Sequence, residues 1–513
     1  MEKRIAVKVI SFVGYKETVC YLSRGENLLE ALIGYGLFIS NECGGMGTCG
    51  KCIIRVVEGN LEITPRDREI FPDSHLSEGY RLACMAYPDK DCTIFISSGI
   101  NTEFEVVTKT DNIIGSDDIP IKAYAIAIDL GTTTLAFALV ALPGGNILDK
   151  YSAVNLQRLY GADVISRIKA ATEGKLKSLS RIIREELLYG ISSLADKQQI
   201  KLSSINQIVI SGNTTMIHLL MEYPCDGLGV YPYTPVNLGL INTFTDDIFG
   251  IEDKIPIMIL PGISVFVGGD ITSGLLASGI RLKEKPCLFM DLGTNGEIAL
   301  GNKEKILVTS TAAGPAFEGG NISCGVGSIP GAICHASFEG SVLSYETIDN
   351  KPPIGICGTG VIEIAAELLK NNIIDSSGLL ADPYFDTGYP IADMELIQQD
   401  IRELQLAKAA IRAGVDVLLR NYNINYEDLD EVYIAGGFGY HLDINKAIDI
   451  GLLPEAVKDK VKAVGNTSLS GAIHTLTDSD AKNKIEHILS STEEIHLSNA
   501  DEFSDLFIDY ISF

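Results

Sequence analysis

A short motif that occurs twice constrains the fold of this chain more than any other feature. The first copy is Asp129-Leu-Gly-Thr-Thr-Thr134 and the second is Asp291-Leu-Gly-Thr-Asn-Gly-Glu297. Each copy lies between two apolar runs and is followed by a polar turn and a third apolar stretch, which indicates three strands with a carboxylate at the end of the first. A repeated three-strand unit predicts two similar lobes that face each other across a cleft.

The residue types in both turns suit a polyphosphate ligand. Glycine allows the backbone to approach a ligand, and successive N–H groups with threonine hydroxyls form an anion-binding concavity without a lysine. The aspartate before each turn suits Mg²⁺, which keeps much of its water and prefers carboxylate and phosphate oxygens. The sequence therefore predicts that a polyphosphate binds with Mg²⁺ between the two lobes.

The duplicated turn resembles the two phosphate motifs of the superfamily of acetate kinase, sugar kinases, heat-shock chaperones and actin (the ASKHA superfamily). Glu431-Val-Tyr-Ile-Ala-Gly-Gly-Phe-Gly439 resembles the adenosine motif of that superfamily, a strand that ends in a glycine pair. One such turn alone is more often an ordinary hairpin, but two copies followed by the glycine pair indicate nucleotide binding. The resemblance implies a duplicated RNase H-like body, which forms a two-lobed ATPase.

Individual residues receive roles on this basis. Asp129 and Asp291 are the predicted catalytic pair, which serves Mg²⁺ and positions the attacking water. Glu297 and Glu318 are weaker candidates for orienting that water. The residues predicted to bind ATP are Gly131, Thr132, Thr133, Thr134, Gly293, Thr294 and Asn295 for the phosphates and Gly436 and Gly437 for the nucleoside.

Four of the eleven cysteines form a cluster pattern in the N-terminal part of the sequence. Cys43, Cys49 and Cys52 form the pattern C-x5-C-x2-C, and Cys84 is a distant fourth. The pattern differs by one residue from that of plant-type [2Fe–2S] ferredoxins, in which one loop supplies three thiolates. Structural zinc sites usually use two close cysteine pairs, and only Cys49 and Cys52 form such a pair here. We therefore predict that these four cysteines hold a [2Fe–2S] cluster.

The chain of 513 residues is too long for a single hydrophobic core, so a multidomain α+β and α/β protein is expected. The cysteines and flanking strands resemble a β-grasp ferredoxin domain, which ends near residue 97. A polar stretch of mixed composition follows. The predicted parts are the ferredoxin-like domain (1–97), a linker (98–120), the first ASKHA lobe (121–285) and the second ASKHA lobe (286–513), whose C-terminal helix packs back on the first.

Several further polar residues are interpreted from their local context. Gly212-Asn-Thr-Thr215 follows a strand and opens an apolar helix, which suits either a ligand oxygen or simple capping. His218 lies inside that helix and is predicted to be packed. Asp270 is either a helix cap or a carboxylate of the cleft, and we favour the cap. Three glycine-rich stretches near residues 313–320, 324–327 and 354–360 indicate backbone that approaches a ligand or partner, or ordinary turns.

Charge and hydropathy exclude some function classes. The formal net charge of −26 would repel a phosphate backbone, so nucleic acid is not an expected partner. No stretch of about 18 apolar residues occurs, and the N-terminus is charged, so neither a membrane span nor a signal peptide is expected. We therefore expect a cytoplasmic protein.

The full set of motifs is similar to that of the reductive activators of corrinoid proteins, and the match covers nearly the whole chain. The resemblance implies ATP-dependent reduction of a methyltransferase corrinoid from Co(II) to Co(I) by one electron from the cluster. It also implies two partners, a corrinoid protein and an upstream low-potential electron donor. Larger members carry an extra domain for which the linker here has no room, so the oligomeric state stays open.

Three alternative functions fit parts of the same pattern. A small-molecule kinase of the same superfamily with a redox-sensing ferredoxin domain would need a catalytic carboxylate, for which Asp270 is the candidate. A dehydratase-type activator would hold a [4Fe–4S] cluster between its lobes, which the four N-terminal cysteines disfavour. A plain electron carrier without ATPase activity is disfavoured by the presence of both Asp129 and Asp291.

Overall fold

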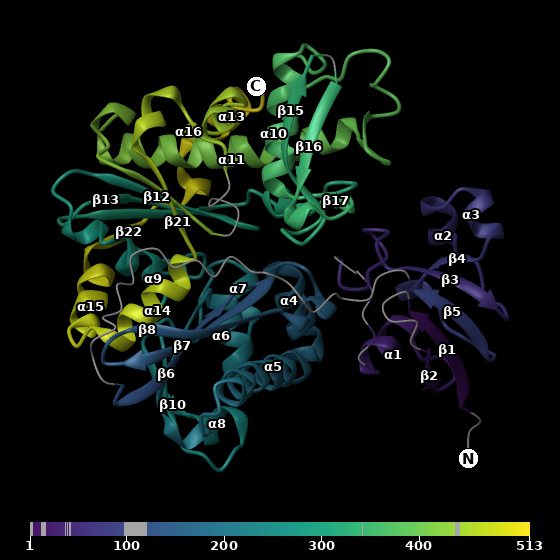
Figure 1. Cartoon of the computed structure of the whole chain (residues 1–513), viewed down its shortest axis with the longest axis horizontal. Helices are drawn as coiled ribbons and strands as arrows, with labels where there is room; N and C mark the ends of the chain where they lie inside the picture. The colour runs from purple at the N-terminus through teal and green to yellow at the C-terminus, as the bar shows by residue number, and fades with distance from the viewer. Residues whose placement is uncertain are drawn as a thin grey trace.

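The computed structural model describes residues 4–11, 17–35, 37, 39, 43–96, 121–340, 342–436 and 442–513. The predicted linker and Gly437 lie outside these residues. Figure 1 shows a small N-terminal sheet domain beside a larger body made of two sheets with helices around them. No helix in the part of the chain that the structure describes has the length and apolar character needed to cross a bilayer.

The N-terminal domain is a five-stranded mixed sheet with the strand order β2-β1-β5-β3-β4. Its strands are β1 (Ile5–Ser11), β2 (Glu17–Leu22), β3 (Ile53–Glu58), β4 (Tyr80–Leu82) and β5 (Cys92–Ile96). Strands β1 and β5 pair in parallel, and the other pairs are antiparallel. Helix α1 (Leu28–Gly34) is capped by Asn27 and buries its leucines, which closes the core of this domain.

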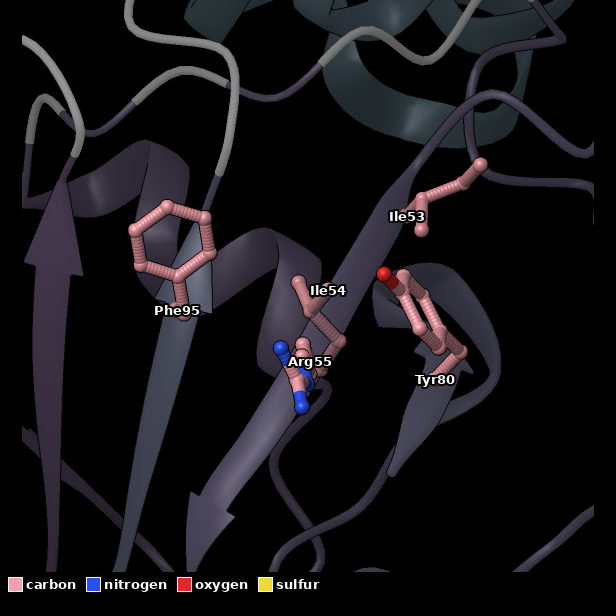
Figure 2. A pocket seen from close by; sticks show the side chains of 5 residues that line it. All are labelled: Ile53, Ile54, Arg55, Tyr80 and Phe95. Atoms are coloured by element: carbon pink, nitrogen blue, oxygen red, sulfur yellow. The ribbon is translucent and has the colours of Figure 1, made fainter. Parts of the chain in front are cut away.

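A small pocket lies on the N-terminal sheet (Figure 2). Five residues of β3, β4 and β5 line it: Ile53, Ile54, Arg55, Tyr80 and Phe95. The guanidinium carbon of Arg55 lies 5.8 Å from the centre of the Tyr80 ring, a cation–π distance. None of the predicted site residues lines this pocket, so it is separate from the candidate functional site.

The first lobe contains a six-stranded sheet with the order β10-β11-β9-β6-β7-β8. Its strands are β6 (Ala123–Leu130), β7 (Thr134–Leu142), β8 (Asn146–Val154), β9 (Ile205–Gly212), β10 (Ile241–Phe244) and β11 (Pro256–Ile259). Strands β6, β7 and β8 form an antiparallel meander, and β9 and β11 continue the sheet in parallel with β6. The main helices are α4 (Val164–Ala170), α5 (Leu176–Lys197), α6 (Thr214–Met221) and α9 (Gly269–Ser278).

The second lobe repeats this arrangement with the strand order β21-β20-β12-β13-β14-β22. Its strands are β12 (Cys287–Leu292), β13 (Gly296–Gly301), β14 (Ile306–Thr311), β20 (Val432–Ala435), β21 (Val461–Gly465) and β22 (Thr492–Glu494). A smaller sheet is formed by β15 (Ala332–Glu339), β16 (Val342–Thr347) and β17 (Gly355–Ile356). The main helices are α10 (Gly358–Lys370), α11 (Gln398–Tyr422), α13 (Ile444–Asp449), α14 (Thr467–Thr477), α15 (Ala481–Ser491) and α16 (Asp501–Asp509).

The duplicated motif occupies the same position in both sheets, which confirms the predicted repeat. Asp129 lies next to Ala136 on β7 and Ser211 on β9. Asp291 lies next to Glu297 on β13 and Ala435 on β20. The two sheets differ at their edges. In the first sheet β10 pairs antiparallel with β11, whereas in the second sheet β22 pairs in parallel with β14.

Helices α9 and α14 join the two lobes through a close backbone contact. A Cβ atom at Gly471 of α14 would lie 2.1 Å from the carbonyl oxygen of Ser273 on α9. A Cβ atom at Gly274 would lie 2.7 Å from the ring of Phe289 on β12. Glycine is therefore needed at this crossing, since any larger residue would push the two helices apart.

We expect Gly471→Ala to lower the free energy of unfolding by about 1–3 kcal/mol, because overpacking of a tight contact costs about this much. Denaturant unfolding of the purified protein measures the change. Gly327→Ala is the matched control, since a Cβ atom there meets nothing within 4 Å. Equal stability of the two variants would show that the helices separate without cost.

Candidate functional site

The four predicted cluster cysteines meet as two pairs in the N-terminal domain. Cys43, Cys49 and Cys52 lie in the loop before β3, and Cys84 lies in the turn after β4. The sulfur atoms of Cys52 and Cys84 are 3.1 Å apart, and the side chains of Cys43 and Cys49 are hydrogen-bonded to each other. The pairing therefore does not follow the close pair Cys49 and Cys52: Cys52 pairs with the distant Cys84, and Cys49 pairs with Cys43 of the same loop.

Each cysteine pair contains one thiol that ionises readily. The hydrogen bond with Cys49 lowers the pKa of the Cys43 thiol to about 4, and the hydrogen bond with Cys84 lowers the pKa of Cys52. The pKa values of Cys49 and Cys84 are raised by the same bonds and by burial. Because thiolates bind metal, two sulfur pairs fit a two-iron cluster with one pair on each iron.

Glycines determine the course of the cluster loop. Gly44, Gly45, Gly47 and Gly50 all have φ between 62° and 87°. Residues other than glycine rarely adopt this left-handed region, so glycine at these positions favours the tight turn of the loop around the cysteines. A Cβ atom at Gly47 would also lie 2.8 Å from the sulfur of Met85.

Asp129 at the end of β6 is held by residues of the second lobe. Its carboxylate accepts hydrogen bonds from Asn466 Nδ2 at 2.8 Å and from Ser468 Oγ at 2.7 Å. Both donors lie at the N-terminus of α14, and Asn466 also caps this helix. Sequence reasoning did not assign these two residues, although Val464-Gly-Asn-Thr-Ser468 repeats the pattern of Gly212-Asn-Thr-Thr215.

Glu318 connects the two phosphate turns. Its Oε2 atom accepts a hydrogen bond from Thr294 Oγ1 at 2.7 Å and another from Thr133 Oγ1 at 3.2 Å. The turns themselves are closed by backbone bonds from Gly131 to Thr134 and from Gly293 to Asn295. The Glu318 carboxylate therefore accepts hydrogen bonds from hydroxyl groups of both lobes that were predicted to bind phosphate.

Five carboxylates gather at this junction, and burial raises the pKa of each: Asp129, Asp270, Asp291, Glu297 and Glu318. Burial and the neighbouring acids raise the pKa of Asp270 and of Asp291 to about 7. A group of buried acids without a cation is electrostatically unfavourable, and a divalent cation would offset the repulsion.

Asp270 is not the helix cap that the sequence favours. Gly268 is the N-cap of α9, and Asp270 lies in the first turn, where its Oδ1 atom accepts a bond from the N–H of Ile271 at 2.9 Å. Backbone conformation determines the position of the cap. The extended residue before the helix is Gly268, so α9 begins earlier in the chain than predicted. Asp270 instead faces the charges of Asp129 and Asp291.

The other predicted residues lie around the same junction. Gly436 follows β20 with φ 88°, and a Cβ atom there would lie 3.0 Å from Oδ1 of Asp291. Asn213 caps α6, as one of the two open interpretations has it, and also donates from Nδ2 to Oγ1 of Thr132 at 2.8 Å. His218 is fully buried, as predicted, with both ring nitrogens in hydrogen bonds.

The glycine-rich stretches of the second lobe pack on each other. A Cβ atom at Gly358 would lie 1.8 Å from the carbonyl oxygen of Phe317, and one at Gly319 would lie 2.3 Å from that of Val326. These glycines therefore allow backbone to contact backbone. The contact with α10 holds the segment that carries Glu318 in place.

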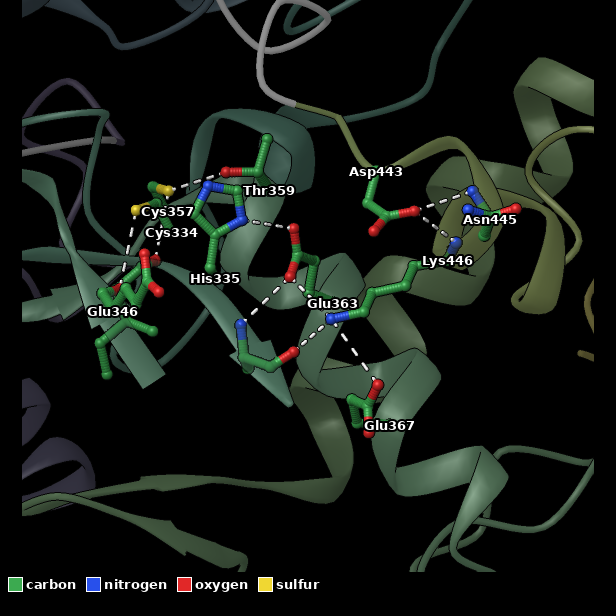
Figure 3. Close-up of polar contacts among 12 residues, drawn as sticks. Cys334, His335, Glu346, Cys357, Thr359, Glu363, Glu367, Asp443, Asn445 and Lys446 are labelled. Carbon is green, nitrogen blue, oxygen red and sulfur yellow. Dashed lines mark hydrogen bonds and ion pairs between the residues drawn. The ribbon is translucent and has the colours of Figure 1, made fainter. Parts of the chain in front are cut away.

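A polar network behind this segment links α10 to α13 (Figure 3). Glu363 of α10 accepts from Lys446 of α13 at 2.8 Å and contacts Nδ1 of His335 at 2.8 Å. Lys446 also lies 3.6 Å from Glu367. The network therefore joins α10 to α13, the helix that follows the glycine pair in the chain.

Three domain families match consecutive parts of the chain. The 2Fe-2S iron-sulfur cluster binding domain matches residues 14–89, the RACo middle region matches residues 124–283, and the C-terminal domain of RACo, the ASKHA domain, matches residues 285–513. The last two families cover most of the body and correspond to its two lobes.

Two relatives are similar over most of their length. The chain is 33% identical to the corrinoid activation enzyme RamQ of Eubacterium limosum, over 77% of this chain and 71% of the relative. It is 27% identical to the [Co(II) methylated amine-specific corrinoid protein] reductase of Methanosarcina barkeri, over 76% and 77%. The N-terminal region alone is 44% identical over 64 residues to one component of the Na⁺-translocating NADH-quinone reductase of Pasteurella multocida, 12% of this chain and 16% of that one.

A solved structure extends the similarity to the whole fold. The reductive activator for corrinoid, iron-sulfur protein aligns with 99% of this chain and 98% of its own, with a TM-score of 0.70 and 30% sequence identity. Since the domains, the relatives matched over most of their length and the fold agree, the chain belongs to the RACo family of corrinoid-protein activators.

Proposed function

We propose that this protein reduces the cobalt of a methyltransferase corrinoid protein from Co(II) to Co(I) and couples the reduction to ATP hydrolysis. One observation carries the proposal: a domain with two cysteine pairs belongs to the same chain as a body whose two predicted phosphate turns face each other. The names of the two relatives and of the similar solved structure support the corrinoid protein as substrate.

The reaction transfers a single electron. When bound by Cys43, Cys49, Cys52 and Cys84, a [2Fe–2S] cluster supplies a one-electron carrier, which an external low-potential donor must refill. Co(II) gains this electron and becomes Co(I), while ATP and water give ADP and phosphate. Plant-type clusters have potentials near roughly −400 mV, and the cobalt couple is generally lower, so the transfer is uphill without a second source of free energy.

The body's residues provide the coupling in this proposal. Asp129 and Asp291 would hold Mg²⁺ and position the attacking water, and the N–H and hydroxyl groups of both turns would bind the phosphates. Asn466 and Ser468 orient Asp129 from the other lobe. Because the contacts of the site cross from one lobe to the other, nucleotide binding and hydrolysis shift the relation between the lobes, and this shift changes the affinity for the two cobalt states.

Glu318 gives a direct test of the nucleotide site. Its carboxylate holds the hydroxyls of Thr133 and Thr294, which the phosphates need. We expect Glu318→Gln to bind ATP several-fold more tightly, because the competing negative charge is removed, and to hydrolyse it about 10²-fold more slowly if Glu318 then orients the water. Calorimetric ATP titration and phosphate release measure the two effects.

Glu297→Gln is the matched control for this prediction, because no hydrogen bond joins Glu297 to the hydroxyls of Thr133 and Thr294 among the contacts of the described residues. Equal tightening of ATP binding in both variants would assign the effect to the charge of the whole site and contradict the specific role of Glu318.

The function itself is tested by following the Co(II) absorbance under anaerobic conditions. The mixture contains the purified protein, a strong reductant, a corrinoid protein in the Co(II) state, and either Mg·ATP or no nucleotide. We expect Co(I) to form only with Mg·ATP. Phosphoryl transfer to a small molecule, without cobalt reduction, would instead support the kinase alternative.

A further inference from the structure

Asn155 anchors a short segment to the first phosphate turn. Its side chain is fully buried. The backbone N–H of Asn155 donates to the carbonyl of Thr133, and its Nδ2 atom donates to the carbonyl of Gly131, both at 2.9 Å. Its Oδ1 atom accepts from the N–H of Gln157 and so starts the short helix Leu156–Tyr160. Asn155 therefore holds the turn and the helix at once.

The other end of this segment contacts the cluster loop of the N-terminal domain. A Cβ atom at Gly44, the residue after Cys43, would lie 2.7 Å from the carbonyl oxygen of Tyr160 and 3.5 Å from Cα of Gly161. Gly161 is equally restricted, because its own Cβ atom would lie 2.3 Å from Cβ of Ser166. The two glycines thus permit backbone packing between the cluster loop and the first lobe.

The segment between these two ends is firmly fixed. Gln157 is fully buried and donates from Nε2 to the carbonyl of Leu179 at 3.0 Å, and the N–H of Leu156 donates to Glu186 at 2.9 Å. The buried guanidinium of Arg167 donates to the carbonyl of Gly161 at 2.9 Å. Residues 155–161 are therefore held to their neighbours by these hydrogen bonds along the segment.

Two contacts flank the packing of the cluster loop. Lys169 Nζ lies 3.1 Å from the sulfur of Met46, and Lys175 Nζ lies 3.4 Å from a carboxylate oxygen of Glu30. Both lysines are half-exposed, so each contact contributes little free energy. The contact at Gly44 is tighter than these two, since it joins backbone to backbone and neither segment can move aside without movement of its backbone.

We propose that residues 155–161 form a coupling segment that transmits the state of the first phosphate turn to the cluster loop, with Asn155 as its positioning residue. The inference rests on the proposed function, in which this turn binds ATP. Thr133 now gives its hydroxyl to Glu318. When a phosphate takes that hydroxyl, the Thr133 carbonyl shifts, Asn155 follows, and the displacement reaches Gly44 and the adjacent Cys43.

The test compares wild type with Asn155→Ala in the full-length, iron-loaded protein. The readout is the rate at which a ferrous-selective chelator removes iron under reducing conditions, with and without saturating Mg·ATP. In wild type we expect Mg·ATP to change this rate about 5-fold or more, the usual lower range of coupling between sites. In Asn155→Ala the change is lost although calorimetry still detects ATP binding.

Asn213→Ala is the matched control, because Asn213 also donates from Nδ2 to this turn but lies outside residues 155–161. It should weaken ATP binding and keep the response at saturating ATP. A response of wild-type size in Asn155→Ala, or no response in wild type, would overturn the inference.

A second pair of variants avoids the buried asparagine. Gly44→Ala and Gly45→Ala impose similar left-handed strain in the same loop, but only the first collides with the coupling segment, since a Cβ atom at Gly45 meets side chains at 3.5 Å or more. Gly44→Ala should lose the ATP response and Gly45→Ala should keep it. Equal behaviour of these two variants contradicts the inference. Failure of the proposed function is distinguishable, because it would appear as absent ATP binding or absent cobalt reduction in wild type.

Discussion

Replacement of Cys84 by serine is expected to abolish cobalt reduction while the ATPase body stays folded. Cys84 pairs with Cys52 at 3.1 Å and is buried in the N-terminal domain, so in the proposed cluster site its loss would remove one of the two protein ligands of one iron. Mutation of a residue that only hydrogen-bonds to a metal ligand lowers metal affinity about 10–100-fold, and loss of a ligand itself should cost at least as much. Iron content, visible absorption and the rate of Co(I) formation measure the effect, which should be about 100-fold or more.

Cys92→Ser is the matched control for this prediction. Cys92 is also buried in the same domain, but burial raises the pKa of its thiol to about 11, and it takes no part in the two pairs. It should keep its iron and its activity. If Cys84→Ser retains the cluster, or if Cys92→Ser loses it, the assignment of the four cysteines is wrong.

Replacement of Asp291 or Asp129 by asparagine is expected to slow ATP hydrolysis by about 10²–10⁴-fold, the usual range for a group that positions or activates a reacting proton or water. The change keeps the shape of each side chain and removes the charge that would bind hydrated Mg²⁺. Cobalt reduction should fall in parallel, because without hydrolysis the lobes have no source of free energy for the uphill transfer. The cluster spectrum should stay unchanged.

Asp196→Asn serves as the control for both variants, since Asp196 is exposed on α5 of the first lobe, away from the turns. It should hydrolyse ATP and reduce cobalt like wild type. Cobalt reduction at the wild-type rate in Asp129→Asn or Asp291→Asn would mean that ATP hydrolysis on these residues does not drive the electron.

The sequence could predict the residues that lie in a local pattern. Asp129 and Asp291 could be found because each ends a strand and starts a glycine turn, and the repeat places both in the same register. The four cysteines could be found because loop spacing reflects ligand geometry. How they pair could not be found, since Cys52 meets Cys84 through the fold of the sheet and not through spacing.

Residues brought together from distant parts of the chain were not predictable in the same way. Asn466 and Ser468 reach Asp129 only because α14 of the second lobe returns to the first lobe. Glu318 was only a weak candidate, because nothing in its neighbourhood shows that it touches both turns. The wrong cap assignment for Asp270 arose because capping depends on backbone angles that the residue type does not fix.

The central claim is that nucleotide drives one electron from this protein to cobalt, and a single-turnover experiment tests it most directly. The protein is reduced, freed of excess donor, and mixed with a Co(II) corrinoid protein with Mg·ATP, with Mg·ADP or without nucleotide, while Co(I) absorbance is recorded. The account predicts that Co(I) forms only in the mixture with Mg·ATP. Its amount should not exceed about one cobalt per chain, because the cluster carries one electron. Co(I) formed equally without ATP, or ATP hydrolysed with no Co(I), would contradict it.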